Sequence, residues 1–331
     1  MLSRLDRAAG VLVGGACGDA LGVPHEFEDP AEGRLRMSGG GLGPYAPGEW
    51  SDDTQMTLCI ALGAVVGELT GVADLDRVAD RFLRWRTDGA TDVGVATDAV
   101  LTAAGPPGEG SAARLRRAAR QLHERTGRTA GNGALMRTSV VALVPTAGRD
   151  ETADLASRVA ALTHADPLVS ESCVLWTEAV RRAVVDGALD LRSGLDLISA
   201  NRRAAWSVWI DEAESQFPTT DFSRNGYTVT ALQAAWRAVW ETTSSSGVRE
   251  QDFRAAIEAA VRFGGDTDTV AAIAGSLAGA LCGVGGVPVH WWRIVHGWPG
   301  MRLRTLSRLA VAIASLPVGD RPCMPSCVAP G

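Results

Sequence analysis

Two short stretches of this chain combine carboxylates and hydroxyl groups at the start of apolar segments. One is Gly264-Gly265-Asp266-Thr267-Asp268-Thr269, which leads into small and apolar residues up to about Ala280. An acid or hydroxyl before such a run is typical of a helix N-terminus, where the helix dipole favours ionised carboxylates. The two glycines permit backbone conformations that other residues avoid. We therefore expect Asp266 and Asp268 to be ionised oxygen donors that suit Mg²⁺, Mn²⁺ or Ca²⁺.

The other stretch is Ser51-Asp52-Asp53-Thr54, which opens a second apolar, helix-forming segment. Asp52 and Gln55 have the spacing of a capping box, and a single cluster of this kind is most often only a helix cap. Two clusters favour another interpretation, because four carboxylates brought together would repel unless cations lay between them. The pair of stretches therefore predicts a site for two divalent cations.

Composition excludes several classes of function. The chain has 331 residues, 46 % of them hydrophobic, and a net charge of −6. All of its basic residues except His are Arg, so neither a Walker-type phosphate loop nor a Schiff-base lysine is present. An acidic chain without a basic tract is a poor candidate for general nucleic-acid binding.

The N-terminal segment and the cysteines predict a cytoplasmic protein. The apolar run 8–17 is short and continues without an Ala-x-Ala cleavage site, which predicts a buried first helix within residues 1–23 rather than a signal peptide. No apolar run reaches the roughly 18 residues of a membrane span. Four of the six cysteines lie in apolar helical contexts and none forms a Cys-x-x-Cys pair, as in proteins of reducing compartments.

Hydrophobic periodicity predicts an all-α fold, a single compact multi-helix domain over residues 1–316 followed by a Pro-rich tail, 317–331. The tail contains Cys323 and Cys327, and Ser244-Ser245-Ser246-Gly247 reads as a linker. Besides the first helix and the one that follows Asp266, helices are expected over 55–69, 74–86, 94–104, 111–125, 151–163, 168–186, 189–209, 227–241, 251–263, 290–295 and 303–314.

Taken in order, several motifs of the chain resemble those of the ADP-ribosylglycohydrolase family. They cover residues 10 to about 285: Gly15 to Gly22, Pro47 to Met56, Gly131 to Arg137, Thr163-His164, Asn225-Gly226-Tyr227 and Gly264 to Thr269. The resemblance implies an all-helical domain with a binuclear site, usually for Mg²⁺ or Mn²⁺. It also implies cleavage of the bond between ADP-ribose and a modified side chain or small acceptor.

The same resemblance implies roles for individual residues. Carried over by position, the metal ligands would be Ser51, Asp52, Asp53, Asp266, Asp268 and Thr269. Ser51 stands where the family often has Thr, and it keeps the hydroxyl oxygen. A carboxylate would carry the proton when the glycosidic bond breaks, and the candidates for this catalytic role are Glu26, Asp53 and Asp268.

The implied ADP-ribose pocket contains the turn Gly131-Asn132-Gly133, together with His164 and Tyr227. A turn flanked by glycines can hold an anion through backbone N–H groups without Lys. By residue type alone, a lone His or an aromatic at a helix start is more often structural. Their assignment to the pocket therefore depends on the resemblance.

Asp92 bears on the choice of substrate. Asp92-Val93-Gly94-Val95 resembles the segment that arginine-specific members of the family place near the guanidinium, although Val95 stands where Asn is common. A carboxylate can accept both N–H groups of a guanidinium fork, and Asp92 could alternatively be a helix N-cap. The expected substrate is mono-ADP-ribosyl-arginine on a protein side chain, and the expected partner is an ADP-ribosylated protein or an ADP-ribose-containing small molecule.

Two alternatives remain beside arginine-linked ADP-ribose. The same scaffold could act on serine-linked, polymeric or O-acetyl-ADP-ribose, and Asp92 with the loop at Glu26 would discriminate between these linkages. The chain could also be a non-catalytic ADP-ribose-binding protein of the same fold, as lens crystallins of this family illustrate. The presence of all six candidate ligands disfavours this last interpretation.

Overall fold

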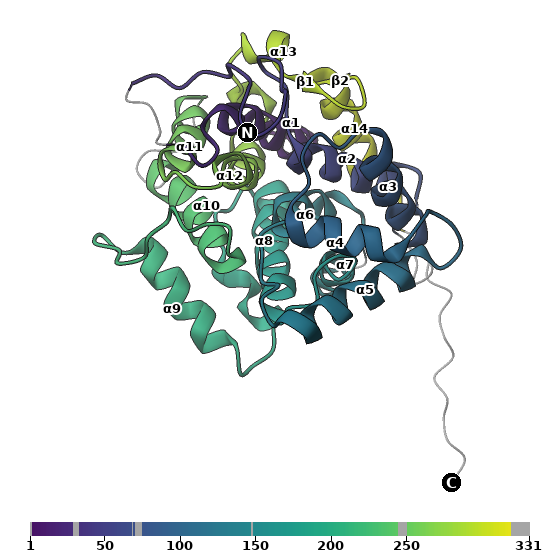
Figure 1. Ribbon diagram of the computed structural model, residues 1–331. Coiled ribbons are helices and arrows are strands. Elements are labelled where there is room, and N and C mark those ends of the chain that lie inside the picture. Colours follow the sequence, from purple (N-terminus) through teal and green to yellow (C-terminus); the bar gives the residue numbers. More distant parts are fainter. Residues whose placement is uncertain are drawn as a thin grey trace.

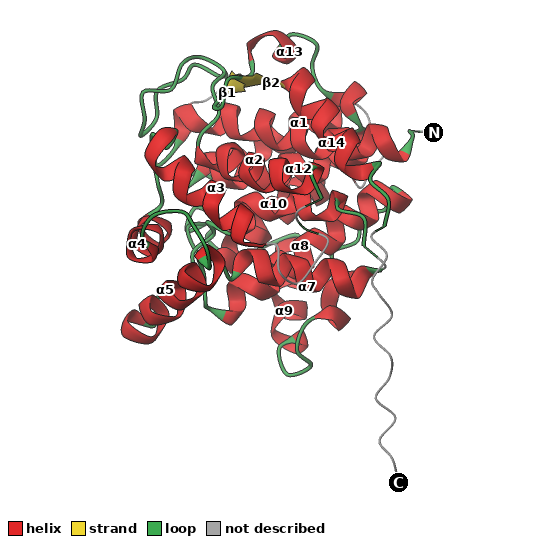
Figure 2. Ribbon diagram, turned by 90° about the vertical axis from the view of Figure 1, so that its right-hand side faces the viewer, coloured by secondary structure: helices red, strands yellow, loops and turns green. Residues whose placement is uncertain are grey.

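The computed structural model of the chain describes residues 2–28, 33–67, 69, 75–146, 148–243 and 250–318. Within these residues the fold is all-α, as predicted, and forms one compact domain (Figure 1, Figure 2). The α-helices are α1 (Arg4–Gly22), α2 (Asp52–Val65), α3 (Leu75–Asp88), α4 (Val95–Ala104), α5 (Ser111–Thr126), α6 (Leu135–Thr138), α7 (Arg149–Ala160), α8 (Pro167–Asp186), α9 (Arg203–Glu214), α10 (Thr228–Thr243), α11 (Glu250–Arg262), α12 (Thr267–Cys282), α13 (Trp291–Ile294) and α14 (Leu303–Ala314).

Short 3₁₀ helices and one small hairpin connect these helices. The 3₁₀ helices are η1 (Val23–His25), η2 (Ser139–Leu143), η3 (Arg192–Leu197) and η4 (Val284–Gly286). Strands β1 (His296–Gly297) and β2 (Met301–Arg302) pair antiparallel, and they form the one sheet in the described part of the chain. In both views α1, α2, α12 and α14 lie in the upper part of the molecule, and α5, α7 and α9 in the lower part (Figure 1, Figure 2).

Most predicted helices are present within a few residues of their expected bounds, but the prediction over 189–209 is wrong. That stretch holds η3 and only the first half of α9, which continues to Glu214. Ser193 explains part of the difference, because its backbone N–H donates to the Asp190 carboxylate and its hydroxyl donates to the Asp190 carbonyl. Such local bonds compete with helical ones, and apolar periodicity does not reveal them.

Helices α1 and α12 pack antiparallel along a row of small residues. The row on α1 repeats every four residues, which puts its members on one face of the helix: Gly10, Gly14, Gly18 and Gly22. A Cβ added to Gly10 would lie 1.9 Å from the Gly279 carbonyl oxygen, and one on Gly18 would lie 1.9 Å from that of Ala271. Only glycine allows two backbones to approach so closely.

This close packing sets where the acidic residues meet. A Cβ on Gly22 would lie 2.3 Å from the Asp268 Cα, so the C-terminal end of α1 touches the first turn of α12. The Thr267 hydroxyl donates a hydrogen bond of 2.9 Å to the Gly22 carbonyl oxygen at the same place. The glycine row therefore places the end of α1 beside the start of α12.

Four cysteines, Cys17, Cys59, Cys173 and Cys282, are buried free thiols, as expected from their apolar contexts. None of the described helices is both long enough and apolar enough to span a bilayer. The predicted linker 244–247, Cys323, Cys327 and nearly all of the predicted tail lie outside the described residues.

Candidate metal centre

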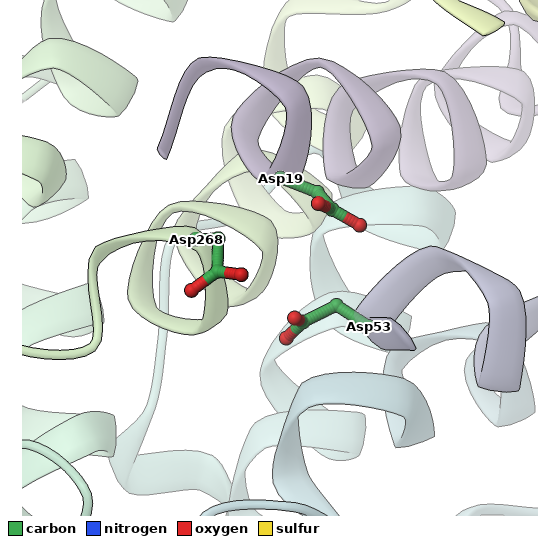
Figure 3. A group of neighbouring side chains, drawn as sticks. All are labelled: Asp19, Asp53 and Asp268. Carbon is green, nitrogen blue, oxygen red and sulfur yellow. The ribbon is translucent and has the colours of Figure 1, made fainter. Parts of the chain in front are cut away.

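The two acid–hydroxyl stretches meet at one place, together with an acid from the first helix. Carboxylate oxygens of Asp19, Asp53 and Asp268 lie within 4.8 Å of one another. They project from α1, α2 and α12 toward a common centre (Figure 3). Glu26, just after η1, forms a second group of this kind with Asp266 and Asp268. The two groups share Asp268, so the carboxylates form one continuous cluster.

Ser51 lies at the middle of the first group. Its hydroxyl is 2.9 Å from Asp19 Oδ1 and 3.0 Å from Oδ2 of both Asp53 and Asp268. A serine hydroxyl has only one proton to donate, so it can satisfy only one of these three oxygens well. The other two oxygens around this hydroxyl are left without its proton, and Asp53 Oδ1 is buried with no partner at all.

Asp19 holds the start of α2 in place. Its Oδ1 accepts from the Ser51 N–H at 2.8 Å, and its Oδ2 accepts from the N–H and the hydroxyl of Thr54 at 2.9 and 2.6 Å. Sequence reasoning did not select Asp19, although it lies in the Gly15 to Gly22 motif. A charged residue within the buried, apolar end of a helix was the signal that could have identified it.

The capping box predicted for Asp52 and Gln55 is not formed. Ser51 is the N-cap of α2 and makes no side-chain cap bond. Gln55 instead accepts a 2.7 Å hydrogen bond from the indole N–H of Trp85 on α3. The buried tryptophan needs a partner for its N–H, and this tertiary contact prevails over the local one.

Burial raises the pKa values of the three carboxylic acids around Ser51, and repulsion between the acids raises those of Asp53 and Asp268 further. For Asp53 and Asp268 burial is the larger cause and the neighbouring carboxylates add to it, so both pKa values lie well above the usual range. At Asp268 burial therefore opposes the ionisation that the helix dipole favours. Burial raises the pKa of Asp19 only to about 6, because four hydrogen bonds from Ser51 and Thr54 lower it.

Glu26 is a half-buried acid of the cluster whose pKa is also strongly raised. Burial first, and then the charges of Asp266, Asp92 and Asp19, raise its pKa to about 8. The next residue, Phe27, is held in the left-handed backbone region at φ 55°, where its N–H donates to the Gly265 carbonyl oxygen at 2.7 Å. This bond ties the Glu26 loop to the turn that precedes α12.

Asp266 is fixed by two asparagines that come from distant segments. Asn132 Nδ2 donates to Asp266 Oδ2 at 2.8 Å and to the Asn225 carbonyl oxygen at 2.9 Å. The side-chain oxygen of Asn225 accepts from the Asp266 N–H at 2.8 Å. Asn225 was part of a quoted motif but was not among the predicted site residues.

The predicted glycine conformations before α12 are present. Gly264 and Gly265 have φ values of 74° and 71°. A Cβ on Gly265 would lie 2.0 Å from the Ser223 carbonyl oxygen, so both the conformation and the space exclude other residues.

Asp52 and Thr269 lie at the edge of the cluster. Asp52 belongs to neither carboxylate group. Its pKa is nevertheless raised by burial and then by Asp19, Asp92, Asp266 and Glu26, so it faces the same acids. The Thr269 hydroxyl hydrogen-bonds the Asp53 side chain and lowers its pKa, which places this hydroxyl beside the first group.

The predicted pocket residues form one corner next to the acids. Gly131 and Tyr227 pair as an isolated antiparallel bridge, and Asn132 N–H donates to the Gly226 carbonyl oxygen at 3.2 Å. His164 is buried, and its Nε2 lies 3.8 Å from where a Cβ on Gly131 would be. The Tyr227 side chain is 40 % exposed. The structure thus brings the turn, His164 and Tyr227 together beside Asp266.

Asp92 lies near the Glu26 side of the cluster, where its charge raises the pKa values of Glu26 and Asp52. It does not cap α4, whose N-cap is Gly94 without a side-chain bond. Its Oδ1 accepts from the Val93 N–H at 2.8 Å, and the second oxygen has no protein donor among the described residues. The Val95 side chain is 89 % exposed, so it forms no wall around Asp92.

Tyr45, which sequence reasoning did not consider, is a further buried polar group near these acids. Burial raises the pKa of its phenol, and the charges of Asp52, Asp19 and Asp92 raise it further. Nothing in its sequence context distinguishes it from a core aromatic.

The cluster fits divalent cations. Hard cations prefer carboxylate and hydroxyl oxygens, and this site offers several of them with too few protons to neutralise their repulsion. Two carboxylate groups that share Asp268 are the arrangement that a pair of ions would need.

Comparisons with known proteins agree with the resemblance seen in the motifs. The chain matches the family model for ADP-ribosylglycohydrolase over residues 1–320. It is 33 % identical over 297 residues to the ADP-ribosylarginine hydrolase Tri1 of Pseudomonas putida (strain GB-1), covering 87 % of this chain and 73 % of the relative. It is 30 % identical over 301 residues to the ADP-ribosyl-[dinitrogen reductase] glycohydrolase of Rhodospirillum rubrum, covering 86 % and 89 %.

A solved structure has the same fold. It is described as an ADP-ribosylglycohydrolase-related protein complex, and it superposes with a TM-score of 0.67 at 28 % identity. The match covers 94 % of this chain and 98 % of that chain.

Proposed function

This chain belongs to the ADP-ribosylglycohydrolase family, and we propose that it removes ADP-ribose from mono-ADP-ribosylated arginine with the help of two divalent cations. The family model and the two relatives named above are ADP-ribose-releasing hydrolases by name, which supports release of ADP-ribose from an ADP-ribosylated substrate. The proposal concerns the linkage, the cations and the residues that act on the substrate.

One observation carries the proposal: the proton-deficient cluster around Ser51. Three buried carboxylates crowd its single hydroxyl at 2.9–3.0 Å. A non-catalytic protein would gain nothing from maintaining this repulsion, which lowers its stability. In a hydrolase the same carboxylate oxygens can bind cations and accept hydrogen bonds from the substrate.

Ser51, Asp52, Asp53, Asp266, Asp268 and Thr269 are the proposed ligands, and the cations are Mg²⁺ or Mn²⁺. Asp19 and Glu26 also offer oxygens to the two carboxylate groups. When bound, such cations polarise hydroxyl oxygens and make water acidic enough to attack near neutral pH. Asp19 orients Ser51 through hydrogen bonds, and Asn132 orients Asp266.

Asp92 is the proposed acceptor for the guanidinium of the modified arginine. One of its oxygens is engaged by Val93 N–H, and the other is open to a ligand. A guanidinium is planar and cationic, and a carboxylate beside it fixes its direction and stabilises its charge. A serine-linked substrate offers no such cation, so Asp92 favours the arginine linkage.

Glu26 is the proposed proton carrier. It is grouped with Asp266 and Asp268, and the charge of Asp92 is close enough to raise its pKa. Burial is the largest cause of its raised pKa, and it favours the protonated carboxyl, which can give its proton to the departing nitrogen. Asp53 and Asp268 are less suited to this role, because cations bound at the cluster would keep them ionised.

The turn Gly131-Asn132-Gly133 and Tyr227 are the proposed contacts for the rest of ADP-ribose. The backbone N–H of Asn132 is already used by Gly226, which leaves those of the glycines for phosphate oxygens. The partly exposed ring of Tyr227, bridged to Gly131, can pack on the ligand.

A release assay on matched substrates tests the proposal. One peptide sequence carrying ADP-ribose on arginine or on serine, together with poly- and O-acetyl-ADP-ribose, would be incubated with the purified chain in EDTA, Mg²⁺ or Mn²⁺. We expect metal-dependent release from arginine that exceeds every other substrate. Faster release from serine would reverse the assignment of the linkage, and equal rates in EDTA and Mg²⁺ would exclude the role of cations.

A further inference from the structure

A fully buried arginine lies beneath the acid cluster without an acidic partner. Arg137, on α6, is 0 % exposed and takes part in none of the ion pairs among the described residues. Its guanidinium lies 4.5 Å from the centre of the Phe82 ring, and Nη1 lies 3.1 Å from the sulfur of Met56. A buried charge without a carboxylate partner costs free energy. The hydrogen bond that Arg137 does make is therefore important for holding it in place.

That hydrogen bond leads to a histidine. Arg137 Nη2 donates to the Thr163 hydroxyl oxygen at 2.6 Å, and the same hydroxyl lies 2.7 Å from His164 Nδ1. Thr163 and His164 are 2 % and 4 % exposed, so water does not compete freely for these groups. The three side chains form a short linear relay from α6 to the histidine ring.

The relay determines which ring nitrogen of His164 holds the proton. Arg137 can only donate, so Thr163 must accept from it, and the Thr163 O–H then needs an acceptor of its own. His164 Nδ1 is the only partner within reach among the described residues. If Nδ1 held a proton, the buried Thr163 O–H would be left unsatisfied. The ring is neutral, because burial and then Arg137 lower its pKa to about 3, and its proton lies on Nε2.

The protonated nitrogen faces the turn that the proposed function assigns to ADP-ribose. A Cβ on Gly131 or Gly133 would lie 3.8 or 3.6 Å from His164 Nε2. No described residue accepts a hydrogen bond from Nε2, and Nε2 is not among the enclosed polar atoms without a partner. This N–H is therefore a free donor at the edge of the turn.

We propose that Arg137 and Thr163 are positioning residues that lock His164 as the Nε2–H tautomer and present that N–H to an acceptor oxygen of the ligand, a phosphate or ribose oxygen. The inference rests on the proposed function for the place of ADP-ribose. Beyond that function, we infer that His164 is a neutral hydrogen-bond donor. Arg137 and Thr163, which do not touch the ligand, determine which of its nitrogens donates.

Nitrogen-15 NMR of the histidine rings tests the tautomer without any turnover. The full chain, labelled on histidine and loaded with Mg²⁺, should show His164 protonated on Nε2, with the resonance assigned by its loss in His164→Gln. Thr163→Ser keeps the hydroxyl and should keep the tautomer. Thr163→Val has the same shape without the hydroxyl, and Arg137→Met removes the donor, so both should give a mixture of tautomers. A proton on Nδ1 in the wild type would overturn the proposal.

Binding of ADP-ribose, followed by calorimetry, tests the consequence. Thr163→Val should weaken binding about tenfold, the value of one hydrogen bond, whereas Thr163→Ser should remain within about twofold of wild type. His164→Gln removes the ring whose tautomer Thr163 sets, and it is the background for a double variant. Adding Thr163→Val to His164→Gln should then cause no further loss, because threonine acts through the histidine.

The double variant separates positioning from a structural role. If Thr163→Val weakens binding equally in the wild-type and His164→Gln backgrounds, threonine does not act through the ring and the proposal fails. If the wild type binds ADP-ribose with the expected tautomer yet releases it from no substrate, the proposed function fails and this inference stands.

Discussion

Replacing Asp53 by Asn should change the stability of the protein in opposite directions with and without divalent cations. Asp53 is 1 % exposed, and its Oδ1 has no partner. In the metal-free protein this carboxyl must be protonated or remain charged among other acids, and either costs free energy. Asn has the same shape as the protonated acid and avoids that cost.

The size of the effect follows from the neighbouring Asp19. Its pKa is raised from 3.8 to about 6, and 2.2 units correspond to about 3 kcal/mol. The native state binds the proton more tightly than the unfolded state, so this stability is present at low pH and is lost as the pH rises from about 4 to about 6. Asp53 is also fully buried and receives fewer hydrogen bonds, and burial is likewise the largest cause of its raised pKa, so the Asp19 figure sets the scale of its cost.

Asp53→Asn should therefore raise the free energy of unfolding by about 3 kcal/mol in EDTA at pH 8, and by progressively less as the pH approaches 4. With Mg²⁺ at a hundred times its dissociation constant, the wild type should gain about 2.7 kcal/mol. The variant lacks a ligand and should gain much less, so its advantage should disappear or reverse.

Urea unfolding followed by circular dichroism measures these differences at several pH values, in EDTA and in Mg²⁺. Asp154→Asn is the matched control, because its side chain is 65 % exposed on α7, and it should change stability by less than about 0.5 kcal/mol in every condition. A variant less stable than the wild type in EDTA at pH 8 would contradict the reasoning, as would an equal gain of both proteins in Mg²⁺.

Further expectations concern turnover and packing. Asp268→Ala should abolish release of ADP-ribose while circular dichroism shows the fold retained; metal-dependent activity at the wild-type level would remove Asp268 from the ligand set. Asp92→Ala should slow arginine-linked hydrolysis by about 10²-fold or more, on the scale of losing one partner of a buried charge pair, and equal losses on all linkages would make Asp92 structural. Glu26→Gln should lower turnover and remove the fall in activity that deprotonation of this carboxyl causes as the pH rises, because only the protonated carboxyl can donate; an unchanged pH profile would assign the proton to another group. Gly18→Ala should lower the free energy of unfolding by about 3 kcal/mol or more, since its Cβ would meet the Ala271 backbone, whereas Gly285→Ala, with open space around it, should have little effect; equal melting temperatures would refute the close packing of α1 on α12.

Much of the fold was predictable because local signals suffice for it. Apolar periodicity and helix-start residues place α2 and α12 close to their observed bounds. The two glycines before Asp266 predicted an unusual backbone conformation, and both have positive φ values. The prediction of one helix over 189–209 was wrong because Ser193 donates local hydrogen bonds to Asp190, which apolar periodicity does not detect.

The candidate site was predictable only in part. Motif order indicated Asp53 and Asp268, and the structure brings them together. Asp19 and Asn225 were missed, although both lie within the motifs, because their role depends on which distant backbone groups they meet. Gln55 was assigned to a local cap because its actual partner, Trp85, is 30 positions away.

The sequence by itself determined the helical class, the acid–hydroxyl stretches and the family, since each is encoded by residue types at short spacing. Only the tertiary structure decided that α1 approaches α12 closely enough to bring Asp19 near Asp268, that Asp19 meets Ser51 at the start of α2, and that Arg137 reaches His164 through Thr163. The physical reason is that burial and hydrogen-bond satisfaction depend on distances between segments far apart in the chain. The same distances raise the pKa values of the clustered acids, which no single stretch of sequence could show.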